Sequence, residues 1–422
     1  MADFPKGFLW GAASASYQIE GGVNEDGRGT SIWDVYSHTP GRIKNGDTGD
    51  VACDSYHRWR EDVQLVKDMG LGAYRFSIAW PRIAPNGDTN WMQNGFEYYD
   101  RLVDALLEAG VQPWATLYHW DLPQALQSKG GWQNEAIIQS YAAYAKKVAQ
   151  HFKGRITHWF TFNEPQCFIG MGCGSGEHAP GLRLDPDSLE TCWKHFRQAH
   201  ALAVDAIHGV DGANLVGLAS TGDVYYPETD RPEDVEAARQ LTFAAAHGPY
   251  SFSYALALDY MCGKEDFIGL NVYNGTAARM GENGPETVLY PVGGPRTAIG
   301  WTVTPESLEW CARFVAERYH LPIYISENGL SCRDKVFLDG KVHDPQRIDF
   351  LTRYLQALSR AIAAGSDVRG YFQWSLIDNF EWAEGYDQRF GLVYVDYPTG
   401  KRIPKDSAGW YKEVAASNGG VL

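Results

Sequence analysis

The segment 156–165 reads ITHWFTFNEP, and the interpretation of the whole chain starts from it. Its apolar, β-branched and aromatic residues predict a buried strand that ends at Glu164. A second segment, 321–329, reads LPIYISENG and ends in the same way at Glu327. A charge at the end of a buried strand is costly unless it has a partner or a use. Two such glutamates on similar strand ends predict a pair of carboxylates that face one site.

Six further apolar runs lie outward from these two, at 8–13, 71–78, 111–118, 215–219, 267–272 and 368–374. Amphipathic patterns separate the runs; one example has apolar residues at helical spacing and a glycine stop. Its members are Phe96, Tyr99, Val103, Leu106, Leu107 and Gly110. Alternating strands and helices predict a parallel sheet, and eight repeats predict a single α/β domain over 1–422, a (β/α)8 TIM barrel.

Polar and aromatic residues stand at the predicted C-terminal ends of these strands. They are Gln18, Arg75, His119, Trp120, Asn163, Asn271, Tyr273 and Trp374. The loop after the last strand adds Glu381 and Trp382. The active sites of (β/α)8 barrels lie at this end of the barrel, so we expect these side chains to surround the two glutamates.

Each of these residues also has an ordinary structural interpretation. A strand-end glutamate can cap the next helix, Arg75 can pair with a structural acid, and most of the fifteen tryptophans must serve packing. The combination favours a sugar site, because Arg75 can keep one glutamate ionised. Trp120, Trp374 and Trp382 offer flat apolar faces to a sugar ring. A carboxylate pair is the minimal equipment for cleaving a glycosidic bond.

Charge and the remaining motifs exclude several classes of function. The net charge is −15 without a basic stripe, so we expect no nucleic-acid partner. Seven cysteines without a C-x-x-C pair do not form a disulfide framework pattern, and no metal-binding spacing or G-x-S-x-G elbow occurs. Alternating glycines in 170–176 fit no phosphate-binding motif and are interpreted as a loop over the site.

The N-terminal segment MADFPKGFLW lacks the features of a signal peptide. No apolar run approaches the ~20 residues of a membrane-spanning helix. We therefore expect a cytoplasmic protein that does not bind membranes, uses no metal and no organic cofactor, and acts on a small molecule. The sequence leaves the oligomeric state open.

Several motifs together give the chain a marked family resemblance. They are FLWGAA at 8–13, QIEG at 18–21, SIWD at 31–34, YRFSIAWPR at 74–82, LYHWDLP at 117–123, TFNEP at 161–165, HAPG at 178–181, SENG at 326–329, and WS at 374–375 with DNFEW at 378–382. With these motifs the chain resembles glycoside hydrolase family 1, the β-glucosidase family, almost from end to end.

The resemblance assigns roles to individual residues. It implies that Glu164 is the general acid/base and Glu327 the nucleophile. The positions that hold the non-reducing sugar in the family match Gln18, His119, Asn163, Glu381 and Trp382. Tyr273 matches the tyrosine that hydrogen-bonds the nucleophile, and Trp374 matches the platform under the sugar ring. We further expect Trp120 to contact the sugar, and Arg75 and Asn271 to support the nucleophile.

The chain departs from the family pattern in one segment. From Ala244 to Asp266 it is much shorter than the family's usual run and lacks two of that run's motifs. We therefore expect a shortened fifth βα unit. The catalytic residues should be unaffected, whereas contacts to the leaving group and any oligomer interface built there are in doubt.

The resemblance implies a retaining β-glycosidase that works by double displacement. It would release the terminal sugar from small β-glucosides or cello-oligosaccharides, with β-galactosidase or β-fucosidase activity besides. A 6-phospho-β-glycosidase is one alternative, although its phosphate-binding loop would need a serine and a lysine where this chain has Glu381, Glu384 and no lysine. A sugar-binding barrel without catalysis is the other, although such relatives lose one of the two glutamates.

Overall fold

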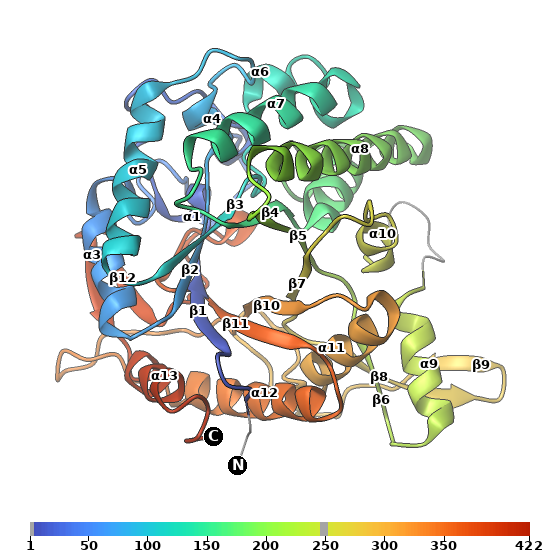
Figure 1. Cartoon of the computed structure of the whole chain (residues 1–422). Coiled ribbons are helices and arrows are strands. Elements are labelled where there is room, and N and C mark those ends of the chain that lie inside the picture. Colours follow the sequence, from blue (N-terminus) through green and yellow to red (C-terminus); the bar gives the residue numbers. More distant parts are fainter. Residues whose placement is uncertain (1–3, 245–251) are drawn as a thin grey trace.

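Eight parallel strands close into a barrel in the computed structural model, which describes residues 4–244 and 252–422 (Figure 1). The strands follow one another around the barrel in chain order, and β11 pairs with β1 to close it. Their bounds are β1 Leu9–Ala13, β2 Ala73–Ser77, β3 Gln112–Thr116, β4 His158–Asn163, β5 Leu215–Ser220, β7 Phe267–Asn271, β10 Ile323–Asn328 and β11 Val368–Trp374. The predicted (β/α)8 barrel is confirmed, and each predicted run contains or overlaps one barrel strand.

Aromatic side chains fill the inside of the barrel. Trp114 lies 5.2 Å from Phe372 and 5.5 Å from Phe267 between ring centroids. Glycines on the strands leave room for these rings: a Cβ atom at Gly269 would lie 2.6 Å from the ring of Phe160. The barrel interior is therefore a packed core, and the space for a ligand lies at the strand ends.

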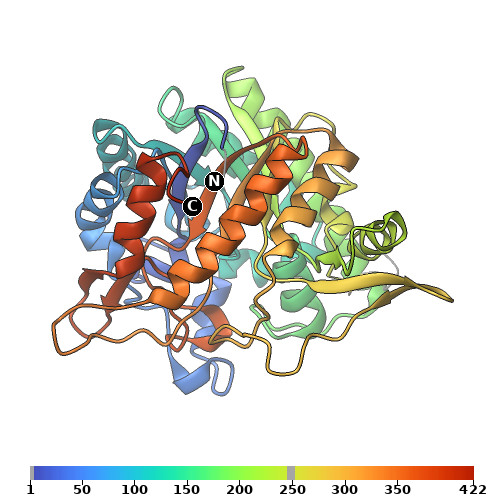
Figure 2. The same ribbon diagram turned by 90° about the horizontal axis from the view of Figure 1, so that it is seen from below.

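Helices surround the barrel as an outer layer (Figures 1 and 2). The predicted helix around Phe96 is α5. The helix bounds are α1 Ser16–Ile19, α2 Ile32–Ser37, α3 Ser55–Asp68, α4 Trp80–Ile83, α5 Gln93–Glu108, α6 Gln124–Gln127, α7 Ala136–His151, α8 Pro186–Val210, α9 Pro232–Thr242, α10 Ala255–Leu258, α11 Glu306–Tyr319, α12 Pro345–Ala363 and α13 Asp406–Ala416. None of the described helices is long and apolar enough to cross a membrane.

The two ends of the chain meet next to β1. Trp10 donates to Asn418 at 3.1 Å, and Asn418 donates to the carbonyl of Phe4 at 2.9 Å. The N- and C-terminal segments accordingly lie side by side in both ribbon views (Figures 1 and 2). The C-terminal helix thus covers the seam where the first and last barrel strands pair.

Two small sheets outside the barrel were not predicted. One contains β6 Tyr225–Pro227, β8 Thr276–Gly281 and β9 Gly284–Thr287; the other pairs β12 Val393–Asp396 with β13 Lys401–Pro404. The predicted shortening between Ala244 and Asp266 falls partly on 245–251, outside the described residues, and stays a prediction. The expectation of one domain over 1–422 also stays a prediction.

Candidate active site

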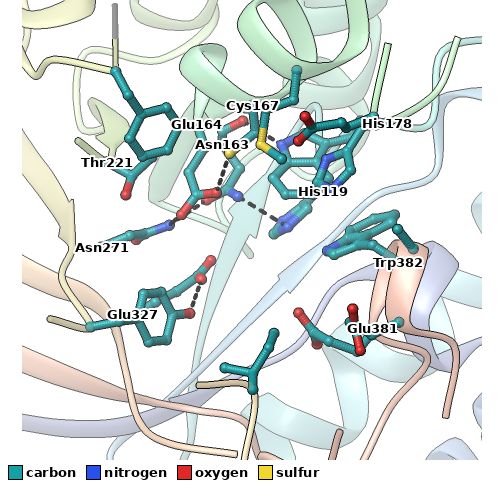
Figure 3. Close-up of a pocket in the computed structure, with 18 of the residues that line it drawn as sticks. His119, Asn163, Glu164, Cys167, His178, Thr221, Asn271, Glu327, Glu381 and Trp382 are labelled. Atoms are coloured by element: carbon teal, nitrogen blue, oxygen red, sulfur yellow. Dashed lines mark hydrogen bonds between the residues drawn. The ribbon is translucent and has the colours of Figure 1, made fainter. Parts of the chain in front are cut away.

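A cavity of about 790 Å³ opens at the C-terminal ends of the barrel strands. Ten of the predicted site residues line it: His119, Trp120, Asn163, Glu164, Asn271, Tyr273, Glu327, Trp374, Glu381 and Trp382. The other two stand behind this wall: Arg75 hydrogen-bonds Glu327, and Gln18 hydrogen-bonds Glu381. The structure therefore brings all twelve predicted residues together at one end of the barrel, with Glu164, Glu327 and Glu381 around one space (Figure 3).

Glu327, at the end of β10, is held by a cation and a phenol. Arg75 Nη1 donates to Oε1 at 2.6 Å, and Tyr273 donates its hydroxyl hydrogen to Oε2 at 2.6 Å. Burial raises the pKa of Glu327 above its ordinary value, whereas Arg75 and Tyr273 act in the opposite direction. Both neighbours favour the ionised carboxylate, because each donates to it and one is charged.

Glu164 follows β4 and has a different environment. Asn271 Nδ2 donates to Oε1 at 2.7 Å, and the Cys167 thiol donates to Oε2 at 3.2 Å. Burial, followed by the charge of Glu327, raises the pKa of Glu164 to about 8. Its φ of 46° is left-handed, a conformation that a non-glycine residue adopts at a cost of ~1–3 kcal/mol and that clusters at functional sites.

Asn271, at the end of β7, connects the two carboxyls. Its amide group donates to Glu164 and also lowers the pKa of Glu327. Its Oδ1 accepts the Ser326 hydroxyl at 2.6 Å. The site therefore holds two neighbouring glutamates, one paired with a guanidinium and one without a cationic partner. Such a pair can present one ionised and one protonated carboxyl at the same pH.

Asn163 links Arg75 to His119. Its Oδ1 accepts from Arg75 at 2.7 Å and from Asn271 at 3.0 Å, so its Nδ2 must be the atom that donates to His119 Nε2 at 3.0 Å. His119 Nε2 is then an acceptor, and the ring proton is on Nδ1. Burial, and then the charge of Arg75, lowers the pKa of His119 well below its usual range, so the ring is neutral.

Gln18 and Glu381 form a second polar group across the cavity from Glu164. Gln18 Nε2 and Asn379 Nδ2 both donate to Glu381 Oε2, at 3.3 and 3.0 Å. Burial is the main cause that raises the pKa of Glu381 to about 8. Gln18 Oε1 is buried and has no hydrogen-bond partner in the described part of the chain. Unpaired buried acceptors of this kind can receive hydroxyl groups of a ligand.

Aromatic rings complete the wall. The Trp382 centroid lies 4.4 Å from that of Trp120 and 4.5 Å from that of Trp33. Trp374 lies parallel to His119 at 5.9 Å. These rings leave flat apolar faces beside the polar groups, which is the environment that a sugar ring requires.

Several residues that line the cavity were not among the predicted ones. They include Cys167, Thr221, Trp301 and Phe390, together with His178, which the sequence showed only as part of a motif. The sequence offered one signal for Cys167, its spacing of three residues from Glu164; in the structure it lies in the π-helix η3 (Gln166–Ser175). Thr221, Trp301 and Phe390 lie in loops with no local pattern that points to the site.

A (β/α)8 barrel whose strand ends carry a carboxylate pair, amides and tryptophans has the architecture of a glycoside hydrolase. The chain belongs to glycosyl hydrolase family 1, whose model matches residues 1–255 and 254–420. It is 43% identical to Beta-glucosidase A of Thermotoga maritima over 99% of this chain and 98% of that protein. It is 41% identical to a bifunctional beta-D-glucosidase/beta-D-fucosidase of Bifidobacterium breve over 98% of both chains.

Solved structures show the same fold. The β-glucosidase from Thermotoga maritima in complex with glucoimidazole superposes with a TM-score of 0.88 at 42% identity, covering 99% of this chain and 100% of that one. The same enzyme with galacto-hydroximolactam gives 0.87 at 41% identity, covering 99% of this chain and 100% of that one. The family that the sequence motifs indicated is thus confirmed by comparisons that span the whole chain.

Proposed function

We propose that this protein is a retaining β-glucosidase with Glu327 as nucleophile and Glu164 as general acid/base. The observation that carries the proposal is the unequal environment of the two buried glutamates. Glu327 has Arg75 and Tyr273 as donors, whereas Glu164 has only an amide and a thiol and a pKa of about 8. A double displacement needs one ionised and one protonated carboxyl at the start.

In the first step Glu327 attacks the anomeric carbon while Glu164 gives its proton to the leaving oxygen. The bond to the leaving group breaks, and a glycosyl–enzyme ester forms on Glu327. Esterification removes the negative charge of Glu327, and with it one of the causes that raise the pKa of Glu164. Glu164 is then a carboxylate that can take a proton from water, which attacks the ester and restores the β-configuration.

The sugar end of the cavity supports a glucoside as substrate. Gln18, His119 and Glu381 surround it with acceptors and donors for hydroxyl groups, and Trp374 lies beside His119. The names of the relatives, a β-glucosidase and a bifunctional glucosidase/fucosidase, point the same way. The test is a turnover panel of aryl β-glucoside, β-galactoside, β-fucoside and β-glucoside 6-phosphate. We expect the glucoside or fucoside to be the best substrate; no turnover of any neutral glycoside would overturn the proposal.

A 6-phosphate should be a poor substrate, because the loop after β11 brings partly buried Glu381 and rim residue Glu384 to the cavity. The loop itself contains no lysine, as the sequence showed, but Lys44 from a distant segment lies 3.1 Å from Glu384 and 2.9 Å from Asp387. Lys44 is exposed, however, and its charge is already offset by these two carboxylates. These contacts therefore favour a β-glucosidase that acts on unphosphorylated glucosides over a phospho-β-glycosidase.

We expect kcat/KM for an aryl β-glucoside to exceed that for its 6-phosphate by at least ~100-fold, about 2.7 kcal/mol. The gap should widen as the pH rises through 8, where Glu381 becomes ionised and repels the phosphate. Glu381→Ser should narrow the gap, mainly by harming the neutral substrate. Glu384→Ser should narrow it as well, because it removes a carboxylate that offsets the charge of Lys44. Equal kcat/KM for both substrates in the unchanged enzyme would favour a phospho-β-glycosidase.

Arg75 should set the acidic limb of the pH–rate profile. We expect a bell, with the acidic limb reporting ionisation of Glu327 and the alkaline limb, near pH 8, reporting loss of the Glu164 proton. Arg75→Met removes the cation that stabilises ionised Glu327, so its pKa rises and the acidic limb moves up by about 1–3 pH units. The control Arg75→Lys keeps a positive charge and should shift the limb less. An unmoved limb in the methionine variant would show that Arg75 does not hold Glu327 ionised.

The alternative of a sugar-binding barrel without catalysis differs in one respect that can be measured. Such a protein would bind a gluconolactone but turn over no aryl glucoside. Both glutamates and their supporting residues are present here, which favours catalysis. Titration with the lactone beside a turnover assay separates the two functions.

A further inference from the structure

Three potential metal ligands meet outside the catalytic cavity. They are His200, in the middle of α8, and Cys262 and Glu265, which lie between α10 and β7. One ligand atom from each lies within 4.8 Å of the other two, and this is the one such group of three among the residues that the structure describes. Helix α8 lies outside the barrel beside β4 and β5 (Figure 1), so the group joins that helix to the start of β7. None of the three residues lines the cavity.

The hydrogen bonds of His200 prepare one ring nitrogen for a ligand. The Thr161 hydroxyl donates to the carbonyl of Gly217 at 3.3 Å, so Thr161 Oγ1 accepts from His200 Nδ1 at 2.8 Å. The proton on Nδ1 is thereby fixed, and Nε2 faces Glu265 at 2.7 Å. Metal-binding histidines are held in this way, with the second ring N–H bonded to an oxygen behind the site.

Glu265 is an ionised carboxylate in a buried position. It accepts from His200 Nε2, from the amide of Cys262 at 2.7 Å and from the amide of Lys264 at 3.1 Å. Backbone amides can only donate, so the Glu265 carboxylate must be the acceptor in these bonds. The side chains of Glu265 and His200 are 0% and 2% exposed, so the pair lies within the protein and shares one proton between Nε2 and the carboxylate.

Cys262 is the accessible member of the group. The other six cysteines are buried, whereas Cys262 is partly exposed. The group of three is therefore nearest to solvent at Cys262. An ion could reach the three ligands from this side without passing through the core.

We propose that His200 Nε2, Cys262 Sγ and Glu265 bind one divalent cation of the zinc class, with water at the fourth position. Mixed nitrogen, sulfur and oxygen ligands favour Zn²⁺ or Co²⁺ over Mg²⁺ and Ca²⁺. Ligand atoms around tetrahedral zinc are roughly 3.5 Å apart. On binding, His200 Nε2 and the Glu265 oxygen, which are 2.7 Å apart without the ion, therefore move apart, and Cys262 Sγ, within 4.8 Å of both, completes the set. Binding releases two protons to solvent, the one shared by His200 Nε2 and the Glu265 carboxylate and the one on the thiol, and the charge of the site is zero before and after.

The bound ion would tie α8 to the segment that leads into β7. Thr161, behind His200, lies on β4 three residues before Glu164, so the ion would also support the strand that carries the proposed acid/base. The site is nevertheless outside the cavity. Hydrolysis of a glucoside should therefore not require the ion.

A cobalt titration tests the proposal. The protein is treated with a chelator, freed of it and titrated with Co²⁺ under reducing conditions. We expect one equivalent per chain to give a thiolate-to-cobalt charge-transfer band in the near ultraviolet and visible bands of tetrahedral cobalt. Zn²⁺ should displace the cobalt and abolish both, and should protect Cys262 from a thiol reagent.

Variants assign the band to this site. Cys262→Ser should lose the charge-transfer band while aryl glucoside turnover stays unchanged, and Glu265→Gln should weaken cobalt binding. His208→Gln is the matched control, because His208 forms a similar pair with Asp266 at 2.8 Å but has no place in the group of three. It should keep the band. The absence of a band in the unchanged protein, or its persistence in Cys262→Ser, would overturn the proposal.

Discussion

Replacing Glu327 with glycine should lower kcat for an aryl β-glucoside by on the order of 10⁵-fold, about 7 kcal/mol of transition-state stabilisation. The substitution removes the carboxylate that attacks the anomeric carbon and leaves a small space behind. The fold should persist, because Arg75 and Tyr273 keep other partners or neighbours: Arg75 also donates to Asn163 and to the carbonyl of Ser326. A thermal melt checks this.

Rescue by a small anion distinguishes a lost nucleophile from general damage. Azide or formate should enter the space left in Glu327→Gly and restore part of the turnover of an activated substrate. With azide the product should be the α-glycosyl adduct, because only one displacement has occurred. Glu177→Gly is the control: it makes the same substitution at an exposed residue that lines the cavity and should keep nearly full activity. Substantial unaided activity in Glu327→Gly would contradict its role as nucleophile.

Replacing Glu164 with alanine should separate the two chemical steps. A substrate whose leaving group needs a proton should lose at least ~10³-fold in kcat/KM, because proton transfer by a positioned group contributes ~10²–10⁴-fold. A dinitrophenyl glucoside should lose no more than ~10-fold in kcat/KM, since its leaving group departs without a proton. The second step lacks its base with every substrate, so the glycosyl–enzyme should accumulate and give a burst of dinitrophenolate.

The thiol beside Glu164 provides a control for this prediction. In the unchanged protein the Cys167 thiol donates to the Glu164 carboxylate at 3.2 Å. Cys167→Ser replaces this donor with a hydroxyl and keeps Glu164, so it should show neither the burst nor the dependence on leaving group. Equal losses for good and poor leaving groups in Glu164→Ala, without a burst, would contradict the acid/base role.

The barrel could be predicted from the sequence because its strands are buried on both sides and therefore read as continuous apolar runs. The run around Trp159, for example, contains β4, with five of its six residues buried. The sheet of β6, β8 and β9 gave no such signal, because β8 has one buried residue and lies near the surface. The predicted shortening of the fifth βα unit includes residues 245–251, which lie outside the described residues, and it stays a prediction.

The site residues that follow recognisable strands could be predicted from the sequence. Glu164 and Glu327 each follow a readable strand, and barrel topology alone places them at the same end. The contact between Gln18 and Glu381 could not be derived from local patterns, since it joins the two ends of the chain. Charge states also needed the structure: burial raises the pKa of Glu381 to about 8, so its repulsion of a phosphate depends on pH.

The proposed metal site shows the same limit. His200 lies in the helical pattern of α8 like any structural histidine, and the spacing of Cys262 and Glu265 matches no metal motif. The sequence therefore predicted no metal. The three residues become a candidate only because hydrogen bonds join helix α8 to the residues just before β7.

The central claim, that Glu327 forms a covalent glycosyl ester, can be measured directly. The enzyme is incubated with a dinitrophenyl 2-deoxy-2-fluoro-β-glucoside, whose fluorine slows the second step more than the first, and is then digested and analysed by mass spectrometry. We predict one fluoroglucosyl group per chain, on the peptide that contains Glu327 and on that residue. A label on Glu164 or elsewhere, or no label while substrate is hydrolysed with inversion, would contradict the account.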